Sequence, residues 1–98
     1  MKTIIVIPTY NEKENIGRLL ESILALKIKD LETVVVDDNS PDETAKIVEE
    51  ISKKEPSVHL LSRKALKGRG AAGKDGFRYA LNHGADYIIE MDADFSHD

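Results

Sequence analysis

The sequence contains no cysteine, which excludes disulfides, thiolate metal sites and thiol catalysis. It also lacks any run of about 18 to 20 apolar residues, the length that a membrane-spanning helix needs. Positive charge is in deficit, because 14 Lys and Arg face 18 Asp and Glu and the net charge is −4. A general nucleic-acid-binding surface or anionic-membrane surface is therefore not expected. Met1 and Lys2 lead straight into an apolar run without a signal-peptide pattern, so we expect a cytoplasmic protein.

A chain of 98 residues is expected to form one domain. Short β-branched or apolar runs predict buried parallel strands at residues 3–7, 32–37, 58–61 and 87–89. The segments between them repeat apolar residues at helical spacing. This βαβαβαβ alternation predicts an α/β fold with an open, mainly parallel, Rossmann-like sheet in strand order 3-2-1-4.

Capping residues predict where the helices begin and end. Asn11, with a glutamate three residues later, forms a capping box before a first helix that should end near Lys27. Ser40 followed by Pro41 predicts the start of the second helix. Small residues on one side of the third helix would let it lie close to the sheet, and Gly84 should end it.

The predicted strand order also indicates which surfaces stay uncovered. Right-handed crossovers place the first two helices on one face of the sheet and only the third helix on the other. We therefore expect much of that second face, and the open edge of the fourth strand, to be bare. Exposed apolar area and unpaired backbone favour association, so a homo-oligomer is expected.

Polar and charged segments follow each of the four predicted strands, at residues 8–12, 37–40, 63–70 and 92–98. In open α/β sheets, functional residues gather at the carboxyl ends of the strands. These segments should therefore share one edge of the sheet, with a crevice between the first and fourth strands.

Asp92 and Asp94 follow the fourth strand and are two residues apart, so on an extended chain their side chains point the same way. An all-oxygen site of this kind suits Mg²⁺ or Mn²⁺, ions that are usually shared with substrate phosphates. The alternative is a solvated acidic strand end, since an Asp-x-Asp triplet is common by chance.

The other segments offer groups that a nucleotide needs. Asp37 or Asp38 can accept hydrogen bonds from the N–H edge of a base or from ribose hydroxyls. The ring of Tyr10 could stack beside a base and Glu12 is a further acceptor, although a surface Tyr and a first-turn Glu explain them equally well. A basic segment beginning at Arg63 supplies cations and backbone N–H groups suited to a diphosphate.

Two competing motifs point to other classes of protein. GRGAAG at residues 68–73 is a formal G-x-G-x-x-G, but it follows the third strand after about six loop residues instead of forming a tight first turn. VVVDDNS and MDAD resemble a receiver-type phosphoacceptor domain, although there the acid pair ends the first strand. A non-catalytic nucleotide-binding module and a receiver-type domain therefore remain as alternatives to an enzyme.

Three motifs together resemble the amino-terminal half of family 2 inverting glycosyltransferases, most closely the dolichyl- or polyprenyl-phosphate mannosyltransferases. The motifs are VIPTYNE at 6–12, VVVDDNSPDET at 34–44 and DYIIEMDADFSHD at 86–98. The resemblance implies a GT-A fold, with residues 1–98 as the half that binds a nucleotide-sugar. It implies transfer from GDP-mannose to a polyprenyl or dolichyl phosphate. Acceptor-binding and membrane-associating segments would lie outside this sequence, so the isolated chain is expected to be weakly active or inactive.

The resemblance also implies roles for single residues, although it identifies no catalytic residue. Residues matched to nucleotide binding are Pro8, Tyr10, Glu12, Asp37, Asp38, Arg63 and Asp92. Residues matched to the Mg²⁺ or Mn²⁺ site are Asp92, Asp94 and Ser96. The basic segment RKALKGRG departs from the family's RPGKLGLG-like pattern while keeping Arg63, Gly68 and Gly70.

Overall fold

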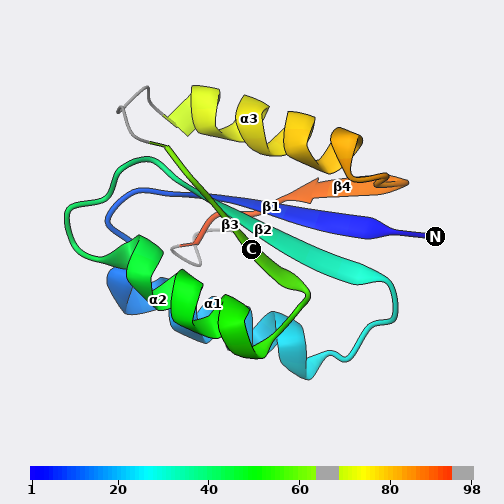
Figure 1. The fold of residues 1–98 in the computed structure, drawn as a ribbon, viewed down its shortest axis with the longest axis horizontal. Helices are drawn as coiled ribbons and strands as arrows, with labels where there is room; N and C mark the ends of the chain where they lie inside the picture. Colours follow the sequence, from blue (N-terminus) through cyan, green and yellow to red (C-terminus); the bar gives the residue numbers. More distant parts are fainter. Residues whose placement is uncertain (64–68, 94–98) are drawn as a thin grey trace.

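The computed structural model describes residues 1–63 and 69–93, which alternate between strands and helices as predicted (Figure 1). The elements are β1 (Thr3–Thr9), α1 (Lys13–Ala25), β2 (Leu31–Asp37), α2 (Thr44–Lys54), β3 (Val58–Ser62), α3 (Arg69–Asn82) and β4 (Tyr87–Glu90). Asp94, Ser96 and Gly68, on which the sequence analysis placed predictions, lie outside the described residues.

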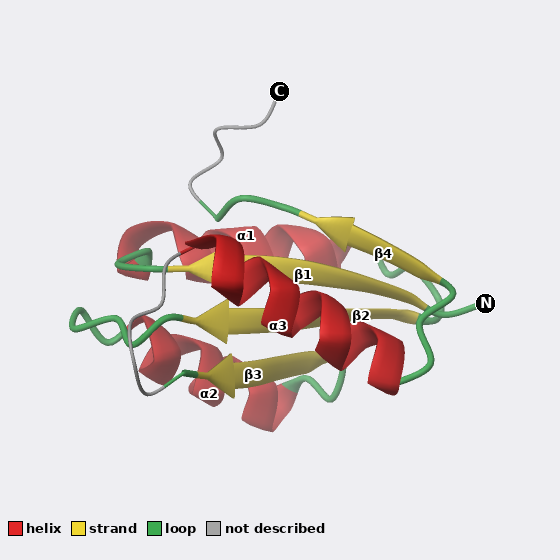
Figure 2. Ribbon diagram, turned by 90° about the horizontal axis from the view of Figure 1, so that it is seen from above, coloured by secondary structure: helices red, strands yellow, loops and turns green. Residues whose placement is uncertain are grey.

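The described strands form a four-stranded sheet in the order β3-β2-β1-β4. All of its pairings are parallel; Val6 of β1, for example, pairs with Val34 of β2 and Glu90 of β4. Figure 2 shows α3 in front of this sheet and α1 and α2 behind it. The predicted fold class, strand order and division of the helices between the two faces are therefore confirmed.

Residues of β1 and β2 are buried on both faces of the sheet because alternate side chains point to opposite sides. On one face, Ile5, Ile7 and Val35 pack with apolar residues of α1 and with Val48 of α2. The other face packs against α3. The buried residues of this second cluster, from the sheet and from α3, are Ile4, Val6, Val34, Val36, Ala72 and Ala80. The central strands are thus as apolar as the sequence runs predicted.

The prediction that much of the second face is bare is wrong. Val6 and Val36 are at most 1% exposed there, because α3 lies very close to the sheet. A methyl group added at Gly76 would collide with the Val6 side chain and come within 2.9 Å of the Val36 side chain. The small residues of α3 therefore allow the close contact that the sequence predicted.

Exposed apolar surface instead lies at β4, so the prediction of a buried fourth strand is also wrong. Tyr87 is 55% exposed and Ile89 is 47% exposed. Ile89 pairs with Ile5, whose side chain faces α1, so both exposed apolar residues of β4 lie on the α1 side of the sheet. Within the described residues, β4 pairs with β1 alone and forms one edge of the sheet.

Both predicted capping residues are wrong, although the first helix starts only one residue later than Asn11 as a cap predicts. The first helix begins at Lys13, and Asn11 precedes it in a left-handed conformation with φ of 56°. The second helix begins at Thr44, four residues after Ser40. The Ser40 hydroxyl does not cap its own helix: its Oγ accepts a hydrogen bond from the Asn11 backbone N–H. The first helix ends at Ala25, close to the predicted Lys27.

The third helix begins at Arg69, within the segment predicted to be a loop. Residues 69–73 of the formal G-x-G-x-x-G motif are therefore helical, which does not fit the tight phosphate-binding turn of a dinucleotide-binding fold. None of the helices in the described part of the chain has the length and apolar character that a membrane crossing requires.

Candidate functional site

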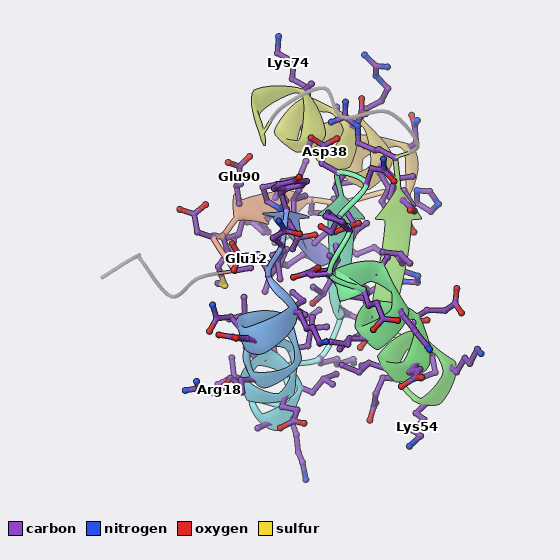
Figure 3. The ribbon with its side chains drawn as sticks, turned by 90° about the vertical axis from the view of Figure 1, so that its left-hand side faces the viewer. Glu12, Arg18, Asp38, Lys54, Lys74 and Glu90 are labelled. Carbon is purple, nitrogen blue, oxygen red and sulfur yellow. The ribbon has the colours of Figure 1, made fainter. Side chains whose placement is uncertain are left out.

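The loops after β1 and β2 meet α3 at the carboxyl ends of the strands, an edge that we call the carboxyl rim. Figure 3 looks onto this rim, with Asp38 after β2, Glu12 before α1 and Glu90 at the end of β4. A pocket of about 30 Å³, close to the volume of one water molecule, opens here. Its lining residues are Pro8, Thr9, Tyr10, Asp38 and Ala72. The structure thus brings Pro8, Tyr10 and Asp38 together, as predicted for a shared edge.

Tyr10 and Asp38 differ in how much of each side chain reaches solvent. Tyr10 is 44% exposed, so part of this residue is accessible to a ligand. Asp38 is only 2% exposed and forms part of the pocket wall. Its backbone N–H donates to the Thr9 carbonyl oxygen at 3.0 Å, which joins the two loops. An aromatic face beside a buried acceptor is an arrangement that can hold the face and the edge of a flat ring.

Asp37 lies behind this pocket with 1% of its surface exposed. Its Oδ1 accepts hydrogen bonds from the Thr9 hydroxyl at 2.8 Å and the Ser40 hydroxyl at 2.6 Å. Its Oδ2 accepts a hydrogen bond from the Ser40 backbone N–H at 3.0 Å. Both oxygens of this carboxylate are therefore engaged by the protein itself.

The first turn of α1 receives its hydrogen-bond acceptors from the loop between β2 and α2. The Asn11 N–H donates to Ser40 Oγ at 2.9 Å, and the Glu12 N–H donates to Thr44 Oγ1 at 3.0 Å. The Lys13 N–H donates to Asp42 Oδ2 at 3.1 Å. These acceptors satisfy backbone donors that a helix start leaves free. Helix capping therefore links the two loops of the rim.

Asp42 is held in its ionised form by the same contacts. Its carboxylate accepts hydrogen bonds from the Thr44 hydroxyl, the Thr44 backbone N–H and the Lys13 backbone N–H. Partial burial raises the pKa of the Asp42 carboxyl, but these hydrogen bonds outweigh it and the pKa lies below its ordinary value. The loop is thus best held at a pH where Asp42 is charged.

Arg63 is a buried cation between two carboxylates. It is 8% exposed, and its Nε lies 3.7 Å from Asp38 Oδ1 and 3.3 Å from Asp75 Oδ2. Among the described residues, its Nη1 and Nη2 atoms are buried and have no hydrogen-bond partner. Sequence reasoning missed Asp75, since nothing in its local pattern on α3 indicates a contact with β3. Buried donors without acceptors are costly, so this guanidinium is suited to a ligand acceptor.

The remaining predicted site residues lie at the rim without joining the pocket. Glu12 precedes α1, and its carboxylate accepts a hydrogen bond from the Asn15 side chain at 3.4 Å. Asp92 follows β4, the strand that pairs with β1. No group of three or more His, Asp or Glu residues able to hold a metal ion occurs in residues 1–63 and 69–93. The arrangement of Asp92 with Asp94 and Ser96 stays a prediction.

A parallel sheet with ligand-facing groups at one rim defines an open α/β domain of the kind that binds nucleotides beyond its strand ends. The sequence model of glycosyl transferase family 2 matches residues 4–98, and the chain belongs to this family. It is 41% identical over 101 residues to the undecaprenyl-phosphate mannosyltransferase of Micrococcus luteus, covering 99% of this chain and 40% of that protein.

Solved structures of glycosyltransferases share the same GT-A fold. Staphylococcus aureus TarS in complex with UDP superposes with a TM-score of 0.83 at 28% identity, over 96% of this chain and 28% of that one. The mannosyltransferase PcManGT of Pyrobaculum calidifontis, in complex with GDP-Man and Mn²⁺, superposes with a TM-score of 0.75 at 27% identity. That match covers 95% of this chain and 27% of the other. The chain thus spans less than half the length of each of these proteins.

Proposed function

We propose that this chain is the nucleotide-sugar-binding half of a glycosyltransferase that passes a hexose, most specifically mannose from GDP-mannose, to a polyprenyl phosphate. The observation that carries the proposal is the pocket where Tyr10, Asp38 and Pro8 meet at the carboxyl rim. Support comes from the family membership and from the name of the Micrococcus relative, an undecaprenyl-phosphate mannosyltransferase. PcManGT holds GDP-Man and TarS holds UDP, so both nucleotides are candidates.

In this proposal the base stacks on Tyr10 and points its polar edge at Asp38. A pocket of about 30 Å³ is too small for a whole base, so only the edge enters and the ring stays over the exposed tyrosine. Asp38 accepts hydrogen bonds from base N–H groups, which a guanine or a uracil both present. Arg63 lies beside Asp38, and its buried Nη atoms, which have no hydrogen-bond partner within residues 1–63 and 69–93, would donate to a carbonyl or phosphate oxygen of the ligand.

We further propose that Asp92, Asp94 and Ser96 hold Mg²⁺ or Mn²⁺ beside the diphosphate. The donors are all oxygen, as these ions prefer, and Asp92 follows the strand adjacent to the one that carries Pro8. Mn²⁺ in the PcManGT complex supports a divalent ion without separating it from Mg²⁺. When bound, such an ion stabilises the negative charge that develops on a nucleoside diphosphate leaving group.

In this proposal, activation of the acceptor does not depend on a catalytic group from this half of the enzyme. A phosphate monoester is largely ionised near neutral pH, since its second pKa lies near 6, so a strong general base is not required to activate it. We propose that acceptor contacts belong to segments outside these 98 residues, and that this chain alone transfers sugar poorly or not at all. Nucleotide binding is therefore the activity that we expect of this chain by itself.

Calorimetry with GDP, UDP and NAD, each with and without Mn²⁺, tests the proposal. We expect binding of GDP or UDP that strengthens with Mn²⁺, and no binding of NAD. Changing both Asp92 and Asp94 to Asn should weaken the nucleotide in Mn²⁺ by about tenfold or more, since it removes the charged metal ligands. An unchanged affinity would contradict the metal site. Acetyl-phosphate labelling of Asp92 would instead support a receiver-type domain.

A further inference from the structure

We propose that Asp37 is a positioning residue, which never touches the nucleotide but holds Tyr10 and Asp38 in place before the nucleotide arrives. The inference rests on the proposed function, because it concerns how the same pocket is built. We call Thr9, Asn11, Asp37 and Ser40 the Asp37 network. Its members lie at the carboxyl ends of β1 and β2 and in the loops that follow them, and these segments supply all of the pocket-lining residues except Ala72.

Asp37 lies outside the pocket wall, and its carboxylate is already engaged by the protein. Its surface is 1% exposed, and it is absent from the residues that line the pocket. Two hydroxyl groups and one backbone N–H already donate to its two oxygens at 2.6 to 3.0 Å. A nucleotide could reach this carboxylate only by displacing those donors, which would leave buried polar groups unpaired. Asp37 therefore acts on the pocket through its neighbours.

The hydrogen bonds of the network fix both residues that flank Tyr10. Thr9, before the tyrosine, donates its hydroxyl to Asp37. Asn11, after it, donates its backbone N–H to Ser40 Oγ, and the same Ser40 hydroxyl donates to Asp37. The backbone of Asp38 is held in turn by its N–H bond to the Thr9 carbonyl oxygen. One buried carboxylate thus restrains the aromatic face and the acceptor edge of the pocket together.

The backbone around the network adopts conformations that need such restraint. Asn11 has φ of 56° and Asn39 has φ of 58°, both in the left-handed region that non-glycine residues seldom occupy. Backbone of this kind persists where surrounding contacts fix it. Without Asp37, fewer contacts would hold these two residues in their left-handed conformations. A nucleotide would then have to order the loops as it binds.

The network and the predicted metal site should therefore be separable by experiment. We would measure, by calorimetry, binding of GDP without metal and binding of pyrophosphate with Mn²⁺, in the wild type and in Asp37→Asn and Ser40→Ala. Ser52→Ala is the matched control, because the Ser52 hydroxyl donates to the Glu49 carbonyl oxygen within α2, away from the pocket. Amide hydrogen exchange at residues 11 and 40 would report the network directly in the same samples.

We expect Asp37→Asn and Ser40→Ala to weaken GDP by about tenfold, the effect of one or two lost hydrogen bonds, and to leave Mn²⁺-pyrophosphate within about twofold. Exchange at residues 11 and 40 should accelerate in both variants, and Ser52→Ala should match the wild type. Ser40→Ala keeps the test valid if Asp37→Asn does not fold.

Two results would overturn the inference. The first is weaker GDP binding with unchanged amide exchange in both variants, which would indicate direct contact between the network and the nucleotide. The second is unchanged GDP affinity with accelerated exchange. A wild-type chain that binds neither GDP nor UDP would refute the proposed function, and unchanged exchange in both variants would then refute the network as well.

Discussion

Asp38 and Arg63 are oppositely charged residues at the carboxyl rim, and both are almost fully buried. The motif VVVDDNS indicated that an acid in this loop would contribute to a site, and the structure places Asp38 in the pocket wall. The third member, Asp75, could not be predicted, because it reaches Arg63 only after α3 has packed on the sheet. The residues next to Asp75 in the sequence do not indicate this contact.

Replacing Arg63 with Ala should destabilise the protein by about 3 kcal/mol, because it removes the Arg63 charge from beside the buried Asp38 carboxylate. The free energy of unfolding, measured in urea, checks this expectation. Arg78→Ala is the control, since Arg78 is an exposed residue of the same region and should change stability by less than about 0.5 kcal/mol. If Arg63→Ala lowers the free energy of unfolding as little as Arg78→Ala does, the Arg63 charge is not needed for folding.

A second charged group lies at the opposite end of the strands. Glu32 accepts from Lys2 Nζ at 3.1 Å and lies 2.7 Å from His59 Nε2. Burial raises the pKa of the Glu32 carboxyl, but hydrogen bonds and charge from Lys2 and His59 outweigh it and lower the pKa overall. The folded protein therefore binds this proton less readily than the unfolded chain, and stability falls as pH drops through the carboxyl range.

Glu32→Gln should make the free energy of unfolding fall less steeply below about pH 4.5, because a glutamine cannot take up that proton. Urea titrations at pH 3 to 7 would measure the slope. Glu21→Gln, at an exposed position of α1, should keep the wild-type slope. If Glu32→Gln also follows the wild type throughout, this carboxyl does not contribute to acid unfolding.

At the scale of elements, strands were easier to predict than helix starts. Buried strands show as apolar runs, and β1, β2 and β3 begin and end within two residues of prediction. Capping signals misled because Ser40 bonds Asp37 and Asn11 rather than its own helix. A cap motif indicates a local preference, whereas the contact between Asn11 and Ser40 joins residues 29 apart in the sequence.

The approach of α3 to the sheet gives a test with an internal control. Gly76→Ala should cost about 1 to 3 kcal/mol of unfolding free energy, since the new methyl group collides with packed valines that cannot move away. Gly73→Ala should be neutral or stabilise by up to about 1 kcal/mol, because its methyl group meets only the flexible carboxylate of exposed Glu90 and alanine favours helix. Similar effects at both positions would contradict the close packing at Gly76.

At the scale of the whole molecule, sequence periodicity and handedness predicted the sheet order and the open edge of the fourth strand, but not how much of the second face α3 covers. The expectation of a bare second face neglected how closely a glycine-containing helix can approach and how much it then covers. The open surface is the edge at β4, with Tyr87 and Ile89 exposed on one side. Phe77 is 51% exposed on α3, one helical turn from the Gly73 that faces β4.

We propose that copies of this chain associate through the β4 edge. Ile89→Lys should abolish association seen by sedimentation velocity at high concentration, whereas Leu26→Lys, at a residue 61% exposed elsewhere, should not. Because each copy carries a net charge of −4, association should strengthen as salt screens repulsion. A wild-type chain that stays monomeric at high concentration and high salt would rule this out.

The dependence of α1 on Ser40, Asp42 and Thr44 also bears on how the chain is made. Three amides at the start of that helix find their acceptors in a segment that a ribosome adds about thirty residues later. Until then the amino-terminal turn has only water to satisfy it. The start of α1 and the part of the pocket wall that lies at the ends of β1 and β2 are therefore completed together.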